Sequence, residues 1–360
     1  MNKAAGKLKI CFVLPGYTRQ PIGGFRMVYD YANHLQKRGH TVLLLCINQN
    51  IMKRYPLPLP IKNVIANHFT KTEPKWFPLN KEIKKVSALR SDYKKYLDDV
   101  DAAVATSVDS AEFTSKTFKS AKKAYFIQDY ENWNVSDKYC QNTYKLGMTN
   151  IVISDWLKGI VDKYSKTPSV LIKDRIDLDV YSISASPEKR KPHTIGLLYH
   201  TMPHKGLKYS LAAIKKLKKK YPNLEVYMFG VPSRPKNFPE WIHYTKEATQ
   251  QQTVEIYNKV SVWLCATVDE GYGLTGLEAM ACGDALVSTA YTGVLEYAKD
   301  GYNALLSPVK DVDALVKNVQ RVFEEDELRN KLVRNAQESV KEFSWDIAVE
   351  RFEEALKMLQ

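Results

Sequence analysis

The chain has 360 residues, of which 44% are hydrophobic, and carries a formal net charge of +13. This length predicts two domains, and the composition is typical of a folded protein rather than a disordered or fibrous one. The charge is uneven, because residues 1–185 hold 29 Lys+Arg and 17 Asp+Glu, a net of +12, whereas the remainder holds 24 and 23, a net of +1. The basic half indicates an anionic partner, such as nucleic acid, an anionic membrane surface or a phosphorylated substrate, unless it is a solvated face.

Cysteine usage and hydropathy narrow the class of protein further. The five cysteines are scattered and have no CxxC spacing, which argues against a disulfide framework or a zinc site and predicts a reducing, cytoplasmic location. The first apolar run, residues 8–14, leads directly into Pro15-Gly16 and predicts a strand and a turn rather than a signal peptide. No apolar stretch approaches the roughly 18–20 residues of a membrane-spanning helix.

The first predicted elements form a strand–turn–helix–strand unit. Residues 8–14 are continuously apolar, as in a strand buried on both faces of a parallel sheet. After Gly23-Gly24 comes a helical pattern that ends at Gly39, and residues 41–47 predict a second buried strand. This order is the first step of a doubly wound α/β fold. The apolar face of the predicted helix contains Phe25, Val28, Tyr31, Ala32 and Leu35.

The rest of the first half contains further strands, a proline-rich loop and a basic helix. Residues 56–60 alternate Pro and Leu and predict a loop. Residues 81–97 predict a helix with an apolar stripe and a basic remainder, which suits either an interfacial membrane helix or a helix packed on the N-terminal sheet. Further strands are predicted at residues 101–105, 124–127 and 150–153.

A second α/β series begins after a linker predicted at residues 184–193, which are small, polar and proline-containing. We therefore predict an N-terminal domain over residues 1–183 and a C-terminal domain over 190–344, with a last helix over 345–360. Restarted alternation indicates a second parallel-sheet domain. Its predicted strands are 194–199, 224–229, 261–266 and 285–288, and its predicted helices are 208–220, 274–282, 312–323 and 327–343.

The segment over residues 269–283 contains the most informative chemistry. Glu270 lies in a glycine-rich loop, and Glu278 follows eight positions later inside the predicted helix. A glycine loop that leads into a helix N-terminus offers unpaired backbone N–H groups to a diphosphate. A carboxylate one turn inside that helix can accept hydrogen bonds from a ribose diol, and a carboxylate in the loop can contact a sugar hydroxyl. Taken alone, the same pattern is also compatible with an ordinary acidic helix start.

The wider sequence resembles glycosyltransferase family 4 of the GT-B superfamily. Residues 269–306 are similar to the donor-binding signature of that family, including its Glu-x7-Glu spacing. The resemblance implies two Rossmann-like doubly wound parallel-sheet domains that face a cleft, with the last helix crossing back to the first domain. The other matching motifs are Glu278–Gly283, Gly293 with Glu296, Asp300-Gly301 with Asn303, Lys205-Gly206, Gly23-Gly24 and Arg38–Val42.

The resemblance also implies roles for individual residues. Glu278 is expected to bind the ribose hydroxyls, Glu270 to face the donor sugar near its C3 and C4 hydroxyls, and Lys205 to neutralise the diphosphate. Two further groups are expected to bring backbone N–H groups or a helix N-terminus to the donor, namely Gly273, Leu274 and Thr275, and Gly23 with Gly24.

The sequence departs from the family pattern at two places. The family usually has an arginine five positions before the lysine, where this chain has His200, so that Arg19 or Arg175 is a candidate replacement. After the predicted strand 124–127, the family often has a histidine that contacts the sugar 6-hydroxyl, whereas this chain has Gln128-Asp129. The stretch Gln128–Glu131 resembles some bacterial rhamnosyltransferase-like members, which makes a 6-deoxy-sugar one candidate donor; otherwise these acids are ordinary loop residues.

The implied reaction is a hexosyl or deoxyhexosyl transfer from a nucleotide-sugar to a glycan or lipid-linked acceptor, with retention of configuration, in bacterial polysaccharide or glycoconjugate synthesis. It needs stabilisation of the leaving diphosphate, and no metal or other cofactor is expected.

The sequence contains three Asp-x-Asp spacings, which can indicate a metal site, but the pattern is short and frequent and its Asp residues often cap a helix or strand. They occur at Asp99-Val100-Asp101, Asp177-Leu178-Asp179 and Asp311-Val312-Asp313.

Three other interpretations stay open from the sequence. The basic half is compatible with a nucleic-acid-binding protein, although no binding module accompanies it. The same fold class also contains sugar-nucleotide epimerases and phosphorylases, and it can serve a catalytically silent partner. A cytoplasmic enzyme that is peripheral on the inner face of the membrane, held by its basic half, would explain the charge.

Overall fold

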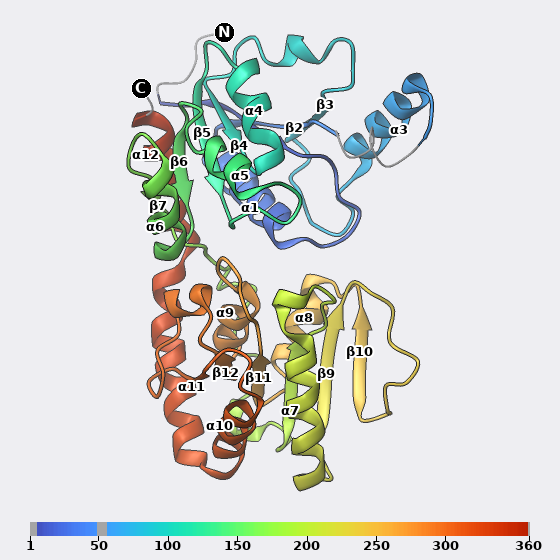
Figure 1. The fold of residues 1–360 in the computed structure, drawn as a ribbon, viewed down its shortest axis with the longest axis vertical. Helices are drawn as coiled ribbons and strands as arrows, with labels where there is room; N and C mark the ends of the chain where they lie inside the picture. Colours follow the sequence, from blue (N-terminus) through green and yellow to red (C-terminus); the bar gives the residue numbers. More distant parts are fainter. Residues whose placement is uncertain (1–5, 49–55, 359–360) are drawn as a thin grey trace. The chain divides into compact units, whose positions relative to one another are not determined.

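The computed structural model describes residues 6–48 and 56–358. Its contacts divide the chain into two compact units, which we describe separately. Unit 1 comprises Met1–Lys173 together with Asp346–Gln360, and unit 2 comprises Asp174–Trp345. Each unit contains one parallel β-sheet with helices around it, which confirms the predicted pair of Rossmann-like domains (Figure 1).

The sheet of unit 1 has the strand order β3-β2-β1-β4-β5-β6-β7, and its strand pairs are parallel. The chain starts in the middle of the sheet, moves to one edge through β3 and returns to the other side through β4, as in a doubly wound fold. The central strands are buried on both faces, which explains their continuous apolar runs. The strands are β1 Lys9–Leu14, β2 Thr41–Cys46, β3 Lys84–Ser87, β4 Ala102–Ala105, β5 Lys122–Ile127, β6 Thr149–Val152 and β7 Val170–Leu171.

Helices of unit 1 cover the sheet, and the last helix of the chain is among them. In that helix, α12, the Phe352 ring lies 4.5 Å from the Tyr31 ring of α1. Glu353 accepts hydrogen bonds from His40 Nε2 and from Arg38 at 3.0 Å. These contacts place the last helix in the compact unit that also contains α1. The helices are α1 Gly23–Lys37, α3 Leu59–Thr72, α4 Val108–Thr117, α5 Asp137–Thr143, α6 Asp155–Tyr164 and α12 Trp345–Met358.

Two predictions for the first half are wrong. Residues 81–97 do not form a helix, because β3 pairs with the edge of β2, in the register Leu43↔Lys84 and Leu45↔Val86, and a short 3-10 turn follows at Tyr93–Tyr96. The spacing of Ile83 and Val86 suits a helix, but backbone hydrogen bonds from β2 override this local pattern. The predicted loop at residues 56–60 is shorter than expected, because α3 begins at Leu59 and accommodates Pro60 in its first turn.

The sheet of unit 2 has the strand order β10-β9-β8-β11-β12-β13, again with parallel pairs. The predicted strands and helices of this half are all present, with bounds shifted by a residue or a few. Two strands and one helix were not predicted: β10 Ile242–Lys246, β13 Ala304–Ser307 and α8 Gln250–Tyr257. The remaining elements are β8 Thr194–Leu198, β9 Glu225–Gly230, β11 Val262–Cys265, β12 Ala285–Thr289, α7 Leu207–Lys220, α9 Leu274–Ala281, α10 Val312–Glu324 and α11 Asp326–Val340.

The segment predicted as a linker is fastened to unit 2. Ser184 N donates to Asn258 Oδ1 at 2.7 Å, and Arg190 forms a buried ion pair with Asp284 at 2.7 Å. Arg190 also donates to the Val260 carbonyl at 2.8 Å. The boundary between the units therefore lies at Lys173 and Asp174, before the predicted linker at residues 184–193.

Candidate functional site

The predicted donor loop of unit 2 follows β11 and ends in the first turn of α9. Gly273 is the N-cap residue of α9 and has φ +88°, a left-handed conformation that favours glycine. A Cβ at this position would lie 1.8 Å from the Tyr291 hydroxyl. Tyr297 donates its hydroxyl to the Gly273 carbonyl at 2.7 Å. Two buried tyrosines, which the sequence analysis did not single out, therefore hold the loop in place.

The predicted lysine turn lies against the same end of β11. Gly206 follows the turn with φ +69°, and a Cβ there would lie 1.8 Å from the carbonyl oxygen of Ala266. The His204 carbonyl accepts a hydrogen bond from Val268 N at 2.7 Å. This backbone contact joins the lysine turn to the start of the donor loop, although more than sixty residues separate them in sequence.

Lys205 and Glu270 form an ion pair, with 19% and 23% of their side chains exposed. The charges of both side chains affect the pKa of Cys265, the last residue of β11. Burial raises the pKa of the Cys265 thiol to about 12; the Glu270 charge also raises it, and a hydrogen bond with Thr275 and the Lys205 charge lower it. The structure thus brings Lys205, Glu270 and Thr275 together around the carboxyl end of one strand, where open α/β sheets bind ligands.

Glu278 lies one turn inside α9 and is 3% exposed. The Tyr257 hydroxyl donates to Glu278 Oε2 at 2.8 Å. Burial, together with the Glu278 carboxylate, raises the pKa of Tyr257 well above its ordinary value, so the phenol stays protonated and donates. Tyr257 is a partner of Glu278 that no motif in the sequence indicated.

Two histidines flank the lysine. Burial and then the charge of Lys205 lower the pKa of His200, and the same two causes lower the pKa of His204. Both imidazoles are consequently neutral at pH 7. His200, which stands where the family has an arginine, brings no positive charge to the lysine turn at that pH.

The other predicted site residues belong to unit 1. Gly23 and Gly24 are the first two residues of α1, and a Cβ on Gly24 would lie 3.5 Å from the Gln128 side chain. Asp129 follows Gln128, and its Oδ1 accepts a hydrogen bond from Tyr130 N at 2.8 Å. The structure therefore brings Gln128 to the N-terminus of α1.

The two candidate replacements for the family's arginine lie in different units. Arg19 is in unit 1, over the Phe69 ring, and Arg175 is buried in unit 2, over the Phe343 ring.

The N-termini of the helices differ in how they are capped. Five helices have a side-chain cap, from Ser107, Ser136, Ser154, Thr249 and Asp311. The three helices that start at the predicted donor residues have none, since α1 begins after Ile22, α7 after Gly206 and α9 after Gly273; α3 and α11 also lack a side-chain cap. None of these three has an acidic residue in its first turn. Their first N–H groups are therefore left for water or an anionic ligand.

Residues 6–48 and 56–358 contain no group of three or more His, Cys, Asp or Glu side chains placed to hold a metal ion. In each Asp-x-Asp spacing at least one Asp side chain bonds a main-chain N–H or a lysine. Asp101 accepts from Lys9 N at 2.7 Å, Asp177 from Asp179 N at 3.0 Å and Asp311 from Ala314 N at 2.9 Å. Independence from metal remains a prediction.

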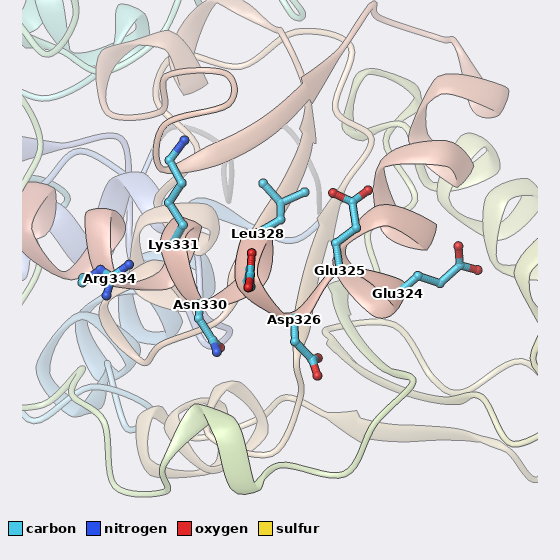
Figure 2. Close-up of a pocket in the computed structure, with 8 residues that line it drawn as sticks. Glu324, Glu325, Asp326, Leu328, Asn330, Lys331 and Arg334 are labelled. Carbon is cyan, nitrogen blue, oxygen red and sulfur yellow. The ribbon is translucent and has the colours of Figure 1, made fainter.

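One pocket of unit 2 lies elsewhere, at the corner between α10 and α11 (Figure 2). Two of its acidic residues pair with surface bases, because Lys220 donates to Glu324 at 2.6 Å and Arg329 to Asp326 at 2.9 Å. None of the predicted site residues lines this pocket, and we assign it no chemistry.

Sequence comparisons agree with the resemblance seen in the motifs. The family model for glycosyl transferases group 1 matches residues 182–339. An uncharacterized glycosyltransferase of Methanocaldococcus jannaschii is 25% identical over 223 residues, 57% of this chain and 59% of that protein. The phosphatidyl-myo-inositol mannosyltransferase of Mycolicibacterium smegmatis is 26% identical over 159 residues, 40% of this chain and 39% of that protein. The chain thus aligns with less than two thirds of the length of these relatives.

Comparison of structures confirms the fold. Sucrose-phosphate synthase from Thermosynechococcus elongatus has a TM-score of 0.76 at 15% identity, covering 98% of this chain and 99% of that chain. Anabaena HepE, solved in complex with UDP-glucose, also has a TM-score of 0.76, at 14% identity, covering 98% and 100%. The chain has the GT-B fold, and residues 182–339 match the family model for glycosyl transferases group 1.

Proposed function

We propose that this chain, whose second unit carries a glycosyl transferases group 1 domain, is a retaining glycosyltransferase that moves a sugar from a nucleotide-sugar to a glycan or lipid-linked acceptor. The observation that carries the proposal is the cluster at the end of β11. Lys205 pairs with Glu270 beside the uncapped N-terminus of α9, and Glu278 lies one turn further inside the helix. A cation and free N–H groups suit the diphosphate of a nucleotide-sugar, and two carboxylates suit the hydroxyl groups of its ribose and its sugar.

In this proposal each group of the cluster holds one part of the donor. Glu278 binds the ribose hydroxyls, and Tyr257 fixes the orientation of its carboxylate. Glu270 accepts from the sugar hydroxyls near C3 and C4 once Lys205 turns to the diphosphate. The backbone N–H groups of Gly273, Leu274 and Thr275 complete the anion site at the start of α9.

The contribution proposed for unit 1 is a second helix N-terminus. Gly23 and Gly24 open α1 without a side-chain cap, so the backbone can approach a phosphate closely. Gln128 and Asp129 are proposed to contact the sugar near its 6-position. The absence of a histidine there keeps a 6-deoxy-sugar, as in rhamnosyltransferase-like enzymes, among the candidate donors.

The chemistry proposed is stabilisation of the leaving group. As the bond between the anomeric carbon and the diphosphate oxygen breaks, negative charge grows on the diphosphate. Lys205 and the helix N-termini neutralise that charge without reorganising, which lowers the barrier. No protein nucleophile is assigned, and the acceptor hydroxyl attacks from the face of the leaving group, so that the configuration is retained. No metal is needed in this scheme.

The acceptor and the place of the reaction are proposed from charge. The net of +12 in residues 1–185 suits an acceptor at an anionic membrane surface, as in the synthesis of bacterial polysaccharides or glycoconjugates. We propose a cytoplasmic enzyme that is peripheral on the inner face of the membrane. Among the described residues, no helix is long and apolar enough to cross a bilayer.

A nucleotide panel tests the donor site. The full chain is heated with UDP, GDP, ADP, CDP or dTDP and with their common sugars, always in EDTA. A ligand at about a hundred times its dissociation constant adds roughly 2.7 kcal/mol, or roughly 5–10 °C for a unit of this size. We expect one base to stabilise the protein, and Glu278→Gln to lose at least about tenfold in affinity for it.

The matched control is Glu327→Ala, an exposed carboxylate of α11 outside the cluster, which should bind nucleotide like the wild type. The transferase is then assayed by release of the nucleoside diphosphate with and without glycan acceptors. No stabilisation by any nucleotide would overturn the donor site, and conversion of the sugar without an acceptor would indicate an epimerase. Binding that needs added Mg²⁺ would contradict metal independence alone.

A further inference from the structure

The loop over residues 128–136 joins β5 to α5 and begins with Gln128 and Asp129, which the proposed function places near the donor sugar. Tyr130 and Glu131 follow them and have no part in that proposal. A loop has no regular ladder of backbone hydrogen bonds, so a loop that recognises a ligand needs side-chain contacts that hold it in one conformation. Tyr130 and Glu131 provide such contacts.

The sheet of unit 1 has two helix N-termini where its strand order reverses. The chain runs from β1 outwards to β3 and returns through β4, so that α1 and α4 begin at the same edge of the sheet, after neighbouring strands. At α1 no side chain caps the first N–H groups, whereas at α4 Val108 N donates to Glu131 Oε2 at 2.6 Å and Ser107 N to Ser110 Oγ at 3.0 Å. The protein itself therefore fills the N-terminus of α4, but not that of α1.

The loop is tied to the helices on both sides of it in the chain. The Tyr130 hydroxyl accepts a hydrogen bond from Gln141 Nε2 at 2.9 Å, and Asn132 Nδ2 donates to Asp137 Oδ1 at 2.8 Å. These two contacts lead to α5, which follows the loop, whereas the contact of Glu131 leads to α4, which precedes β5. Glu131 thus connects the loop to the edge of the sheet from which α1 also starts.

The Gln128 side chain lies beside the first turn of α1. A Cβ on Gly24, the second residue of that helix, would lie 3.5 Å from Gln128 Nε2 and 3.6 Å from its Oε1. An amide group in this place can donate to a bound sugar or accept from it. Three residue steps separate Gln128 from Glu131, a span of at most about 11 Å. Release of Glu131 from α4 would therefore also displace Gln128.

We propose that Glu131 is a positioning residue, whose contact with α4 holds the Gln128 amide at the start of α1 for recognition of the donor sugar. Glu131 does not touch the sugar in this scheme, because its Oε2 is engaged by Val108 N. Its effect is on the sugar and not on the nucleotide, since the ribose and the diphosphate are assigned to groups of unit 2 and to backbone N–H groups of α1. The inference rests on the proposed function, because it needs a nucleotide-sugar at the α1 N-terminus.

Variants of the full chain test the proposal by titration calorimetry. Glu131→Ala removes the contact with α4, Glu131→Gln keeps an oxygen for the Val108 N–H group, and Gln128→Ala removes the amide itself. The matched control is Ser154→Ala, which removes an oxygen that accepts from Leu157 N at 3.2 Å at the start of α6 in the same unit. The ligands are the nucleoside diphosphate that stabilises the wild type, among UDP, GDP, ADP, CDP and dTDP, and the nucleotide-sugars that contain it.

Glu131→Ala should weaken binding of the nucleotide-sugar about fivefold to tenfold, as for one lost hydrogen bond to the sugar, and leave the affinity for the nucleoside diphosphate within about twofold. Glu131→Gln and Ser154→Ala should keep the wild-type ratio of the two affinities. Gln128→Ala should lose as much as Glu131→Ala, and the double variant should lose no more than either, because Glu131 acts through Gln128. Hydrogen exchange in residues 128–136 should be faster in Glu131→Ala and unchanged in Gln128→Ala.

An unchanged ratio of affinities in Glu131→Ala would overturn the proposal, and so would a loss in Glu131→Gln as large as that in Glu131→Ala. If Glu131→Ala does not fold, Glu131→Asp takes its place, because its carboxyl group is one methylene shorter and does not reach Val108 N from the same backbone position. A wild type that binds no nucleotide would overturn the proposed function together with this inference. An unchanged ratio in a protein that binds the nucleotide-sugar would overturn this inference alone.

Discussion

The two units share one architecture but use their glycines differently. In unit 2, a Cβ on Gly206, Gly273 or Gly276 would lie 1.8, 1.8 or 2.4 Å from the Ala266 carbonyl, the Tyr291 hydroxyl or the Tyr297 hydroxyl. In unit 1, a Cβ on Gly23 meets nothing within 4 Å, and one on Gly24 meets the Gln128 side chain at 3.5 Å. Both sets occupy the N-termini of helices that have no side-chain cap.

This difference separates what the fold needs from what a ligand needs. The glycines of unit 2 are required by neighbouring protein atoms, so their presence is explained before any ligand is considered. The fold of unit 1 would tolerate a side chain at Gly23. A requirement for glycine at Gly23 would therefore come from a ligand that approaches the backbone of α1, and not from the fold. The similar motifs at the two sites therefore have different physical causes, and substitutions can distinguish them.

The largest expected difference is between Gly206→Ala and Gly23→Ala. Gly206→Ala places a Cβ against the carbonyl of Ala266 at positive φ, so we expect a loss of about 3 kcal/mol or more in unfolding free energy. Gly23→Ala should leave the free energy of unfolding unchanged or raise it by up to about 1 kcal/mol, while nucleotide-sugar turnover falls. Urea denaturation and turnover assays measure both. Equal destabilisation by the two substitutions would refute the comparison.

The next effect concerns the buried pair of unit 2. Tyr257→Phe removes the hydroxyl that donates to Glu278, leaving a buried carboxylate with one donor fewer, and should cost about 1–2 kcal/mol of stability. Nucleotide affinity should fall along with it, since Glu278 loses its orientation. Tyr227→Phe is the matched control, because Tyr227 donates to Glu225 at the same 2.8 Å at a more exposed site. If calorimetry measured equal losses of stability in the two variants, burial of Glu278 would not strengthen the contribution of its hydrogen bond.

The sequence was sufficient for much of this arrangement, but not for the elements at the edges of the sheets. Buried strands such as β1 and β12 are recognisable, because both faces are apolar. The edge strand β3 was mistaken for a helix, since Ile83 and Val86 fit a helical period and only pairing with β2 decides the outcome. The short edge strand β10 and helix α3 were missed, and α3 gives no ordinary amphipathic signal, because its buried residues are the small Ala66 and Thr70 whereas Ile61 and Val64 are exposed.

The candidate site was predicted in part for a similar reason. Lys205 and Glu270 both lie in motifs that are recognisable in one sequence, but their ion pair was not predicted. Tyr257, Tyr291 and Tyr297 belong to no motif, and nothing in the spacing of a tyrosine reveals that its hydroxyl reaches a loop or a carboxylate. Residues that touch a ligand tend to occur in patterns, whereas residues that hold them come from any element that packs nearby.

His200→Arg should sharpen the account of the lysine turn. His200 is neutral at pH 7, so an arginine would add one positive charge beside Lys205. We expect about a threefold to tenfold gain in affinity for the nucleoside diphosphate at low salt, shrinking as salt rises, with no gain for the nucleoside. Titration calorimetry at two salt concentrations measures this. An unchanged affinity would mean that position 200 does not face the diphosphate and that another residue replaces the family's arginine.

The last expected effect lies in unit 1, where a carboxyl group occupies the N-terminus of α4. Glu131 Oε2 accepts from Val108 N at 2.6 Å. Burial raises the pKa of Glu131 to about 8, against the opposing effect of that hydrogen bond. Between its ordinary value and 8, the folded protein holds a proton that the unfolded chain has released. Stability contributed by Glu131 is therefore complete at low pH and is lost as the pH rises through this window.

Glu131→Gln removes this dependence and keeps an oxygen for the Val108 N–H group. We expect the variant and the wild type to melt together near pH 4 and the variant to be the more stable at pH 8, since each unit of difference between the folded and unfolded pKa is worth about 1.4 kcal/mol. A wild type that is the more stable at pH 8 would show that the carboxylate is charged and is held by the α4 N-terminus. Unit 1 would then use a helix N-terminus for its own anion, whereas the uncapped α1 and α9 leave theirs for a ligand.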